Sequence, residues 1–137
     1  MFDRILLAVD GSAHSRRAVP VAADLAFRYE GEVLVFHARE HEVALGVGVD
    51  AETPQEALDL VDGIVRELKD AGINVRGEIV GVPLGQTSRA ILDAARDGNV
   101  DLIVLGTRGL SEWSRLLMGS VAHKVVHLAE MPVLVVR

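Results

Sequence analysis

Short apolar segments alternate along the chain with longer segments in which apolar residues recur every three or four positions. The short segments have the length of strands, and most are apolar except for one polar residue at an end, as expected where helices cover both faces of a sheet. They are Arg4–Val9, Val33–His37, Ile73–Val80, Asp101–Leu105 and Pro132–Val136. Ile73–Val80 alternates apolar and polar residues, which is typical of an edge or half-covered strand.

The longer segments have the periodicity of helices that bury one face. They cover Ala13–Tyr29, Gln55–Ala71, Leu84–Asp97 and Ser120–Ala129. Ser12 is a suitable N-cap for the first helix, and Gly31 is a suitable stop. The alternation of strands and helices predicts an α/β fold with an open, mostly parallel sheet and right-handed crossovers. The stretch Arg39–Thr53 has neither pattern, and we expect an irregular loop there, either functional or mobile.

Composition restricts the class of protein. The chain has 137 residues, which predicts a single domain over residues 1–137. Half of the residues are apolar, so the chain is not intrinsically disordered, and the absence of cysteine excludes disulfides and thiolate metal sites. The net charge of -6 argues against a face that binds duplex DNA. The apolar runs are too short for a membrane span, and Asp3 and Asp10 are unlike a signal peptide. We therefore expect a cytoplasmic protein that binds neither nucleic acid nor membranes.

Polar and small residues that follow two of the predicted strands form a candidate ligand site. Ligands of an open parallel sheet bind at the carboxyl ends of its strands, where the strand order reverses. The first strand is followed by Asp10-Gly11-Ser12, and the fourth strand and last helix together give Gly106-x2-Gly109-x9-Gly119-Ser120. Glycines allow a close backbone approach, and a helix start supplies unpaired N–H groups with partial positive charge.

This combination is suited to holding a phosphate group. Arg108 can add a charge-assisted hydrogen bond, and Ser120 can donate its hydroxyl. Glycines after strands and a serine at a helix start are also ordinary turn chemistry, so the spacing alone leaves both interpretations open.

The same residues resemble a known family. The glycine pattern, the opening Ile5-Leu6-Leu7-Ala8-Val9-Asp10-Gly11-Ser12 and the closing Pro132-Val133-Leu134-Val135-Val136 resemble the universal stress protein family over the whole chain. The resemblance implies a Rossmann-like fold, a five-stranded parallel sheet in the order 3-2-1-4-5 with two helices on each face. The complete glycine pattern is typical of the branch of the family that binds ATP.

The resemblance also implies a ligand and its contacts. It suggests a stress-response protein that binds ATP or AMP, with Mg²⁺ reaching the site through the phosphates. By resemblance the adenosine end lies against Ala8, Val9, Asp10 and Ala38, and the ribose and phosphates against Gly106, Arg108, Gly109, Gly119, Ser120 and Val121. Ala8-Val9 stands where family members often have Pro or Thr before the aspartate, so a possible hydroxyl contact is lost.

The sequence favours a binding module over an enzyme. It nominates no general base beyond Asp10, although a metal ion and bound phosphates could support slow hydrolysis. The alternatives are a weak ATPase of the same fold and a protein–protein adaptor that binds no nucleotide. The apolar last strand, Pro132–Val136, is an edge in the order 3-2-1-4-5, and an apolar edge invites pairing with another chain. The resemblance implies a homodimer formed by this strand.

Two further patterns are weaker. Gly46-x-Gly48-x-x-Ala51 fits the dinucleotide-binding fingerprint but lacks a strand-to-helix context, so a flexible loop is favoured. His123 and His127 have the spacing of a zinc-binding helix, yet no third ligand accompanies them, and we expect them to face solvent or to interact with the helix dipole at its C-terminal end. The chain contains neither a Walker A loop nor a G-x-S-x-G elbow.

Overall fold

The computed structural model describes residues 1–44, 47–50, 52–107 and 118–137, with only the backbone for residues 42–44 and 47–50. The strands are β1 (Arg4–Ala8), β2 (Glu32–Ala44), β3 (Val47–Asp50), β4 (Asn74–Pro83), β5 (Leu102–Gly106) and β6 (Val133–Val136). The helices are α1 (Ala13–Tyr29), α2 (Pro54–Asp70), α3 (Thr87–Asp97) and α4 (Ser120–Leu128). Each predicted strand and helix is present.

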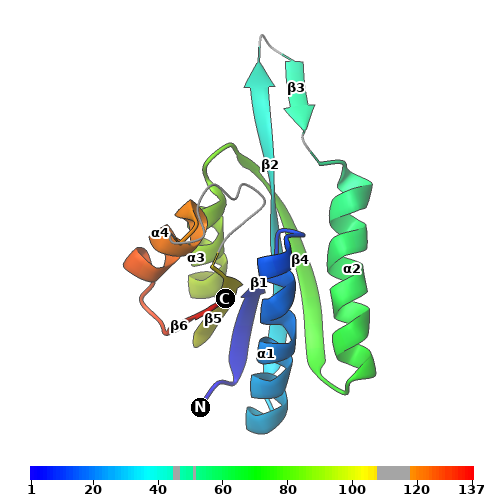
Figure 1. Ribbon diagram of the computed structural model, residues 1–137, viewed down its shortest axis with the longest axis vertical. Helices are drawn as coiled ribbons and strands as arrows, with labels where there is room; N and C mark the ends of the chain where they lie inside the picture. Colours follow the sequence, from blue (N-terminus) through cyan, green and yellow to red (C-terminus); the bar gives the residue numbers. More distant parts are fainter. Residues whose placement is uncertain (45–46, 51, 108–117) are drawn as a thin grey trace.

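Five parallel strands form the main sheet in the order β4-β2-β1-β5-β6 (Figure 1). Counted among the parallel strands alone, this is the predicted order 3-2-1-4-5. The chain moves outward from β1 through β2 to β4, and then crosses back to β5 and β6 on the other side of β1. The strand order therefore reverses between β1 and β5, whose carboxyl ends open to the same edge of the sheet.

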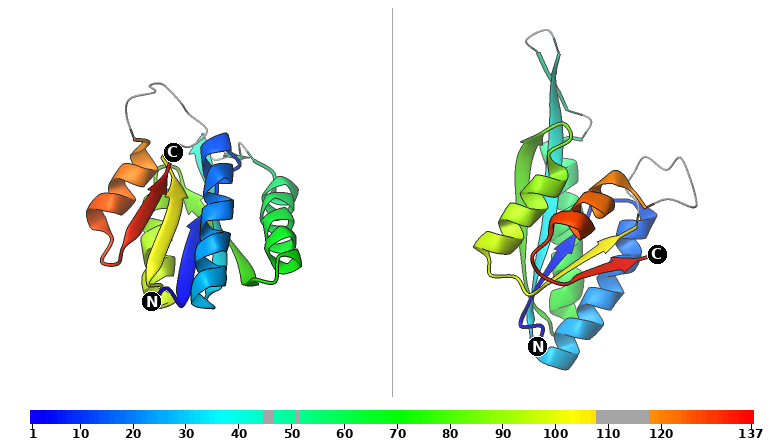
Figure 2. Two further views of the ribbon diagram at one scale, coloured as in Figure 1. Left: turned by 60° about the horizontal axis from the view of Figure 1, so that its bottom comes forward. Right: turned by 90° about the vertical axis from the view of Figure 1, so that its left-hand side faces the viewer.

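Helices cover both faces of the sheet (Figure 2). The helices α1 and α2 pack on the face that holds Ile5 and Leu7, and α3 and α4 pack on the face that holds Leu6. Leu6 and Leu7 are both 0% exposed, which explains why β1 is apolar from Ile5 to Ala8. The edge strand β4 is only partly buried, in keeping with its alternating sequence. Within the described residues, no helix is both long enough and apolar enough to cross a membrane.

The expectation of an irregular loop over Arg39–Thr53 was wrong. Instead, β2 continues to Ala44, and β3 returns antiparallel to it, with Val43 opposite Gly48. We call this extension of β2 beyond Ala38, together with β3, the arm. It projects past the helices in Figure 1 and in the right-hand view of Figure 2, and β4 accompanies only its base. A strand beyond the helices needs no apolar run, so the charged residues at positions 39, 40 and 42 concealed it.

The structure also corrects smaller details. The helix α3 begins at Thr87 because Leu84 still donates its N–H to the His41 carbonyl, after which Gly85 turns the chain with φ 82°. The left-handed residue that ends α1 is Glu30 rather than Gly31. Gly48 lies inside β3, so the dinucleotide-like pattern does not form a strand-to-helix turn there. The other two residues of that pattern, at positions 46 and 51, lie outside the described residues.

Candidate functional site

The turn after β1 holds Asp10 by backbone and side-chain hydrogen bonds. Ser12 donates its N–H to Asp10 Oδ1 at 2.8 Å, and Asp10 donates its own N–H to the Ser15 hydroxyl at 3.0 Å. Gly11 lies between them with φ 84°, a left-handed conformation that favours glycine. Among the described residues none donates to Asp10 Oδ2. The carboxylate is therefore held in place with one oxygen able to accept from a ligand.

Gly106 ends β5 where this strand passes over the start of α1. A Cβ at this position would lie 2.6 Å from the carbonyl carbon of His14 and 2.7 Å from the nitrogen of Ser15, so no side chain fits. The glycine allows two backbones to pack closely, a requirement that the spacing in the sequence did not reveal. The next residue, Thr107, donates its N–H to the Val136 carbonyl at 2.9 Å, which continues the ladder toward β6.

The start of α4 is joined directly to the end of β5. Gly119, the N-cap of α4, donates its N–H to the Thr107 carbonyl at 2.6 Å. The first helical hydrogen bond runs from the His123 N–H to the Gly119 carbonyl, so the N–H groups of the three intervening residues have no helical acceptor. No side chain of the described residues caps them. Unpaired donors and the positive end of a helix therefore lie beside the ends of β1 and β5, where the strand order reverses. We call this position the switch point.

The other three helices begin differently. The side chains of Ser12 and Thr53 cap α1 and α2, each accepting from a backbone N–H three residues further on. At the start of α3, the Glu40 carboxylate accepts from the Thr87 hydroxyl at 2.7 Å and from the Gly85 N–H at 3.3 Å. Within the described part of the chain, α4 is thus the helix whose start has neither a side-chain cap nor a carboxylate.

The end of β1 lies beside the middle of β2, with Ala8 opposite Phe36. Ala8 and Val9 are 8% and 5% exposed, so their side chains belong to the core. Ala38 is half-buried, continues β2 beyond this point and packs against the cluster between the sheet and α3 and α4. These residues can offer a ligand mainly backbone groups and a small apolar surface.

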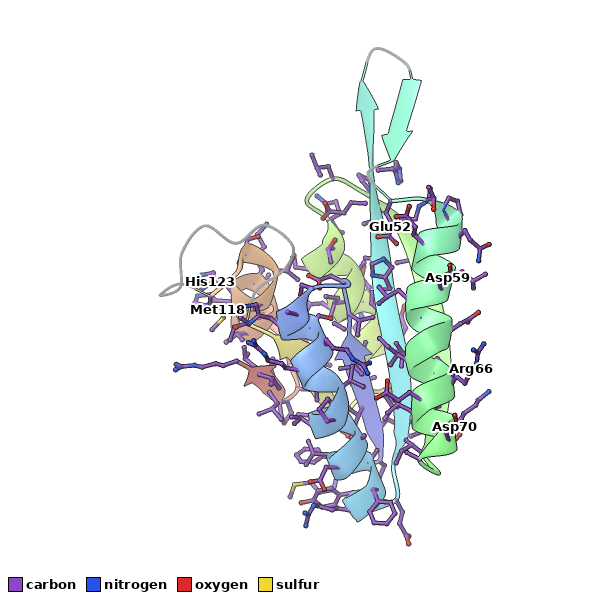
Figure 3. All side chains as sticks on the ribbon, turned by 45° about the vertical axis from the view of Figure 1, so that its right-hand side comes forward. Glu52, Asp59, Arg66, Asp70, Met118 and His123 are labelled. Carbon is purple, nitrogen blue, oxygen red and sulfur yellow. The ribbon has the colours of Figure 1, made fainter. Side chains whose placement is uncertain are left out.

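A buried histidine in β2 and its half-buried partner, Glu52, escaped the sequence analysis. His37 is 2% exposed, and its Nδ1 lies 2.7 Å from the Val9 carbonyl oxygen. Its Nε2 lies 2.8 Å from Oε1 of Glu52, which precedes α2 (Figure 3). The available signal was a histidine at the end of the predicted strand Val33–His37, next to Ala38, but nothing in the sequence identifies its partners.

The structure brings most of the predicted site residues to one edge of the sheet. Those at the ends of β1 and β5 and at the start of α4 surround the switch point, and Ala38 lies one strand away. Arg108 and Gly109 lie outside the described residues. His123 and His127 are exposed on α4, as predicted, with ring centroids 5.3 Å apart. The described residues contain no group of three or more His, Cys, Asp or Glu side chains placed to hold a metal ion.

Comparison with known proteins identifies the family. The model of the universal stress protein family matches residues 1–137. The chain is 40% identical over 138 residues to the universal stress protein in the QAH/OAS sulfhydrylase 3′ region of Thermus aquaticus, and the match covers all of both chains. The chain therefore belongs to the universal stress protein family.

Solved structures share the fold. The hypothetical protein MJ0577 of Methanocaldococcus jannaschii superposes with a TM-score of 0.83 at 25% identity, over 99% of this chain and 96% of that one. A universal stress protein in complex with cAMP has a TM-score of 0.69, also at 25% identity, over 99% of this chain and 97% of its own. The chain thus shares its fold with a protein whose structure was solved in complex with cAMP.

Proposed function

We propose that this protein binds an adenine nucleotide, ATP or AMP, at the switch point between β1, β5 and the start of α4. One observation carries the proposal: the uncapped start of α4 is held against the end of β5 by the hydrogen bond from Gly119 to Thr107. Family membership and the related protein in complex with cAMP support the adenine nucleotide as the ligand.

The phosphate end fits the groups that are present. Three consecutive N–H groups without helical acceptors, at the positive end of a helix, are suited to bind phosphate oxygens. Gly106 and Gly119 flank this position, and the Ser120 hydroxyl is exposed at its rim. We propose that Arg108 and Gly109 complete it. Mg²⁺, where it takes part, is held through the phosphates.

The adenosine end lies toward β1 and β2. Asp10 accepts from the Ser12 N–H through one oxygen, and we propose that its other oxygen accepts from the ribose or base. Adenine then lies against Ala38 and the backbone of Ala8 and Val9. Because Asp10 is engaged in the turn, its proposed role is to hold the ligand, not to activate water.

The proposed role is that of a regulatory binding module in a stress response. Calorimetric titration of the purified protein with ATP, AMP and adenosine tests this directly. Mass spectrometry of the denatured protein identifies any nucleotide that remains bound through purification. Saturable binding of an adenine nucleotide is the expected result. A protein that binds none of the three ligands and carries none from the cell would instead be an adaptor.

A weak ATPase is the enzymatic alternative. A time course of phosphate release from ATP, with Mg²⁺ titrated, compares the wild type with Asp10→Ala. Release that saturates with ATP and disappears in the variant would assign catalysis to Asp10. The binding role predicts release close to the rate without protein.

We also propose a homodimer formed by β6. On this strand the carbonyls of Pro132 and Val136 accept hydrogen bonds from β5, so the alternation along a strand places the N–H groups of Val133 and Val135 on the open edge. Val135→Pro removes one of those outward donors without disturbing the pairing with β5. Sedimentation equilibrium at micromolar concentration should show a wild-type dimer that shifts toward monomer in this variant. A monomeric wild type would contradict the proposal.

A further inference from the structure

His37 and Glu52 join three segments that are distant in the sequence. His37 ends the covered part of β2, Val9 follows β1, and Glu52 lies in the connection from β3 to α2. The imidazole bridges the other two, with Nδ1 2.7 Å from the Val9 carbonyl oxygen and Nε2 2.8 Å from Glu52 Oε1. The His37 side chain is 3% exposed and that of Glu52 is 25% exposed, so the bridge is largely shielded from water.

The hydrogen bonds assign the protons. The Val9 carbonyl can only accept, so Nδ1 of His37 must carry a proton. The contact between Nε2 and the Glu52 carboxyl group needs a second proton, which is held by one of the two groups. If His37 and Glu52 together carried only one proton, either the contact with Val9 or the contact between the two side chains would bring two hydrogen-bond acceptors together. Because the ring is buried, water would not replace the missing hydrogen bond.

The same residues close the base of the arm. Arg39, the first residue of the arm, donates its Nε–H to the backbone carbonyl of Glu52 at 3.1 Å. Glu52 follows β3 closely and directly precedes Thr53, the N-cap of α2. The two strands of the arm are therefore tied together at their base, and this tie meets the end of β1 through His37. In Figure 3 Glu52 lies at the level where α2 begins, beside β2.

These hydrogen bonds adjoin the proposed ligand site at two positions. Val9, whose carbonyl His37 holds, directly precedes Asp10, and His37 itself directly precedes Ala38. The ring thus contacts the backbone at Val9 and belongs to the residue next to Ala38, two positions of the proposed adenosine end. Both strands of the arm lead to this ring, whereas the phosphate end at α4 does not.

We propose that His37 and Glu52 form a clamp that positions the adenosine end of the site and couples nucleotide binding to the arm. This inference rests on the proposed function, because it concerns the same ligand. Coupling between two sites is reciprocal, so a nucleotide that binds better to the clamped state must also stabilise the arm. His37 and Glu52 are positioning residues that act through the backbone of Val9 and Ala38.

Three variants test the clamp. Glu52→Ala removes the partner of His37. Glu52→Gln keeps a donor for Nε2 of a neutral ring, so the Nδ1–H bond to Val9 is retained. Glu56→Ala is the matched control, because Glu56 is an exposed carboxylate one helical turn further on, and its side chain makes no described contact with His37.

The first measurement is hydrogen exchange of the arm amides in the nucleotide-free protein. We expect exchange at least about tenfold faster in Glu52→Ala than in the wild type. Glu52→Gln and Glu56→Ala should stay close to the wild type. Equal exchange in all four proteins would overturn the clamp.

The second measurement is ¹⁵N NMR of the His37 ring. In the wild type Nδ1 should be protonated, and in Glu52→Gln it should stay protonated while Nε2 becomes an acceptor, because the partner of each nitrogen sets the tautomer. A role in simple space-filling would not fix this tautomer. An unprotonated Nδ1 in either protein would overturn the assignment.

The third measurement is the affinity for AMP by calorimetry. Glu52→Ala should bind AMP at least about fivefold more weakly than the wild type, with rescue in Glu52→Gln. Adding AMP should also slow exchange in the wild-type arm. If the wild type binds AMP and Glu52→Ala binds it equally well, the coupling is wrong and the proposed function stands. If the wild type binds no AMP or other adenine nucleotide, the proposed function fails and the coupling fails with it.

Discussion

The helices on the two faces of the sheet start in different ways, although all four start at the same edge of the sheet. On one face α1 and α2 start at Ser12 and Thr53, whose side chains cap them. On the other face α3 and α4 start without such a cap, and only α3 has a carboxylate, that of Glu40, at its start. A side-chain cap contributes about 1 kcal/mol to the stability of a helix.

This difference concerns the helix that can least do without a cap. At 9 residues α4 is shorter than α1, α2 and α3, which have 17, 17 and 11. Short helices are marginal unless packing or end contacts stabilise them. Buried Ala122 and Val125 supply the packing, and a bound phosphate would supply the missing acceptors. A helix start left unsatisfied beside the switch point thus indicates a ligand site more strongly than the glycines do.

The largest expected effect is on the stability of the fold and concerns Gly106, where β5 packs on α1. Gly106→Ala should lower the free energy of unfolding by at least about 2 kcal/mol, because the new Cβ meets the backbone of His14 and Ser15. Urea denaturation measures this. Gly63→Ala is the control, since a Cβ there has nothing within 4 Å, and it should raise stability by up to about 1 kcal/mol. Equal stability of the two variants would mean that β5 does not pack on α1 as described.

Gly119→Val should instead affect the ligand. With φ -60° and ψ 156°, Gly119 has a backbone conformation that valine can adopt, so the fold should persist by circular dichroism. The branched side chain would enter the space in front of the free N–H groups. We expect ATP to bind at least about tenfold more weakly, or about 1.4 kcal/mol. Unchanged affinity by calorimetry would remove the phosphate site from α4.

Substitution of Arg108 tests whether a positively charged side chain, in addition to the start of α4, binds the phosphates. Arg108→Ala should weaken ATP binding by about 1 kcal/mol more than adenosine binding, since only ATP offers the anionic partner. Titrations with both ligands measure the difference. Equal losses for the two ligands would show that Arg108 shapes the loop without contacting phosphate.

The smallest effect concerns the carboxylate at the start of α3. Glu40→Gln keeps an oxygen to accept from the Thr87 hydroxyl but removes the negative charge, so stability should fall by at most about 1 kcal/mol. Glu40 lies at the base of the arm, but the substitution leaves the contacts of His37 and Arg39 with Glu52 in place, so the affinity for AMP should not change. A loss of AMP affinity of about tenfold, the size expected for ATP in Gly119→Val, would mean that the comparison between α3 and α4 is wrong.

The sequence predicts the body of the fold well because covered strands and one-sided helices have distinct periodicities. The arm was missed, since its strands lie beyond the helices and need no apolar run. The positions after β1 and β5 could be predicted to lie close together because the ends of parallel strands share one edge. The contacts between distant residues could not be predicted. Glu52 lies 15 residues from its partner His37, and Gly106 packs on His14 at the start of α1, 92 residues away by numbering. Such pairings depend on how helices and strands pack, which local patterns do not record.

The most direct test of the account follows the backbone amides at the starts of α3 and α4 by NMR while AMP is added. We predict saturable shifts for Ser120, Val121 and Ala122, because their N–H groups would bind the phosphate. The amides of Thr87 and Ser88 at the start of α3 should remain unchanged. Shifts at the start of α3 without shifts at the start of α4, at AMP concentrations that calorimetry shows to be saturating, would contradict the central claim.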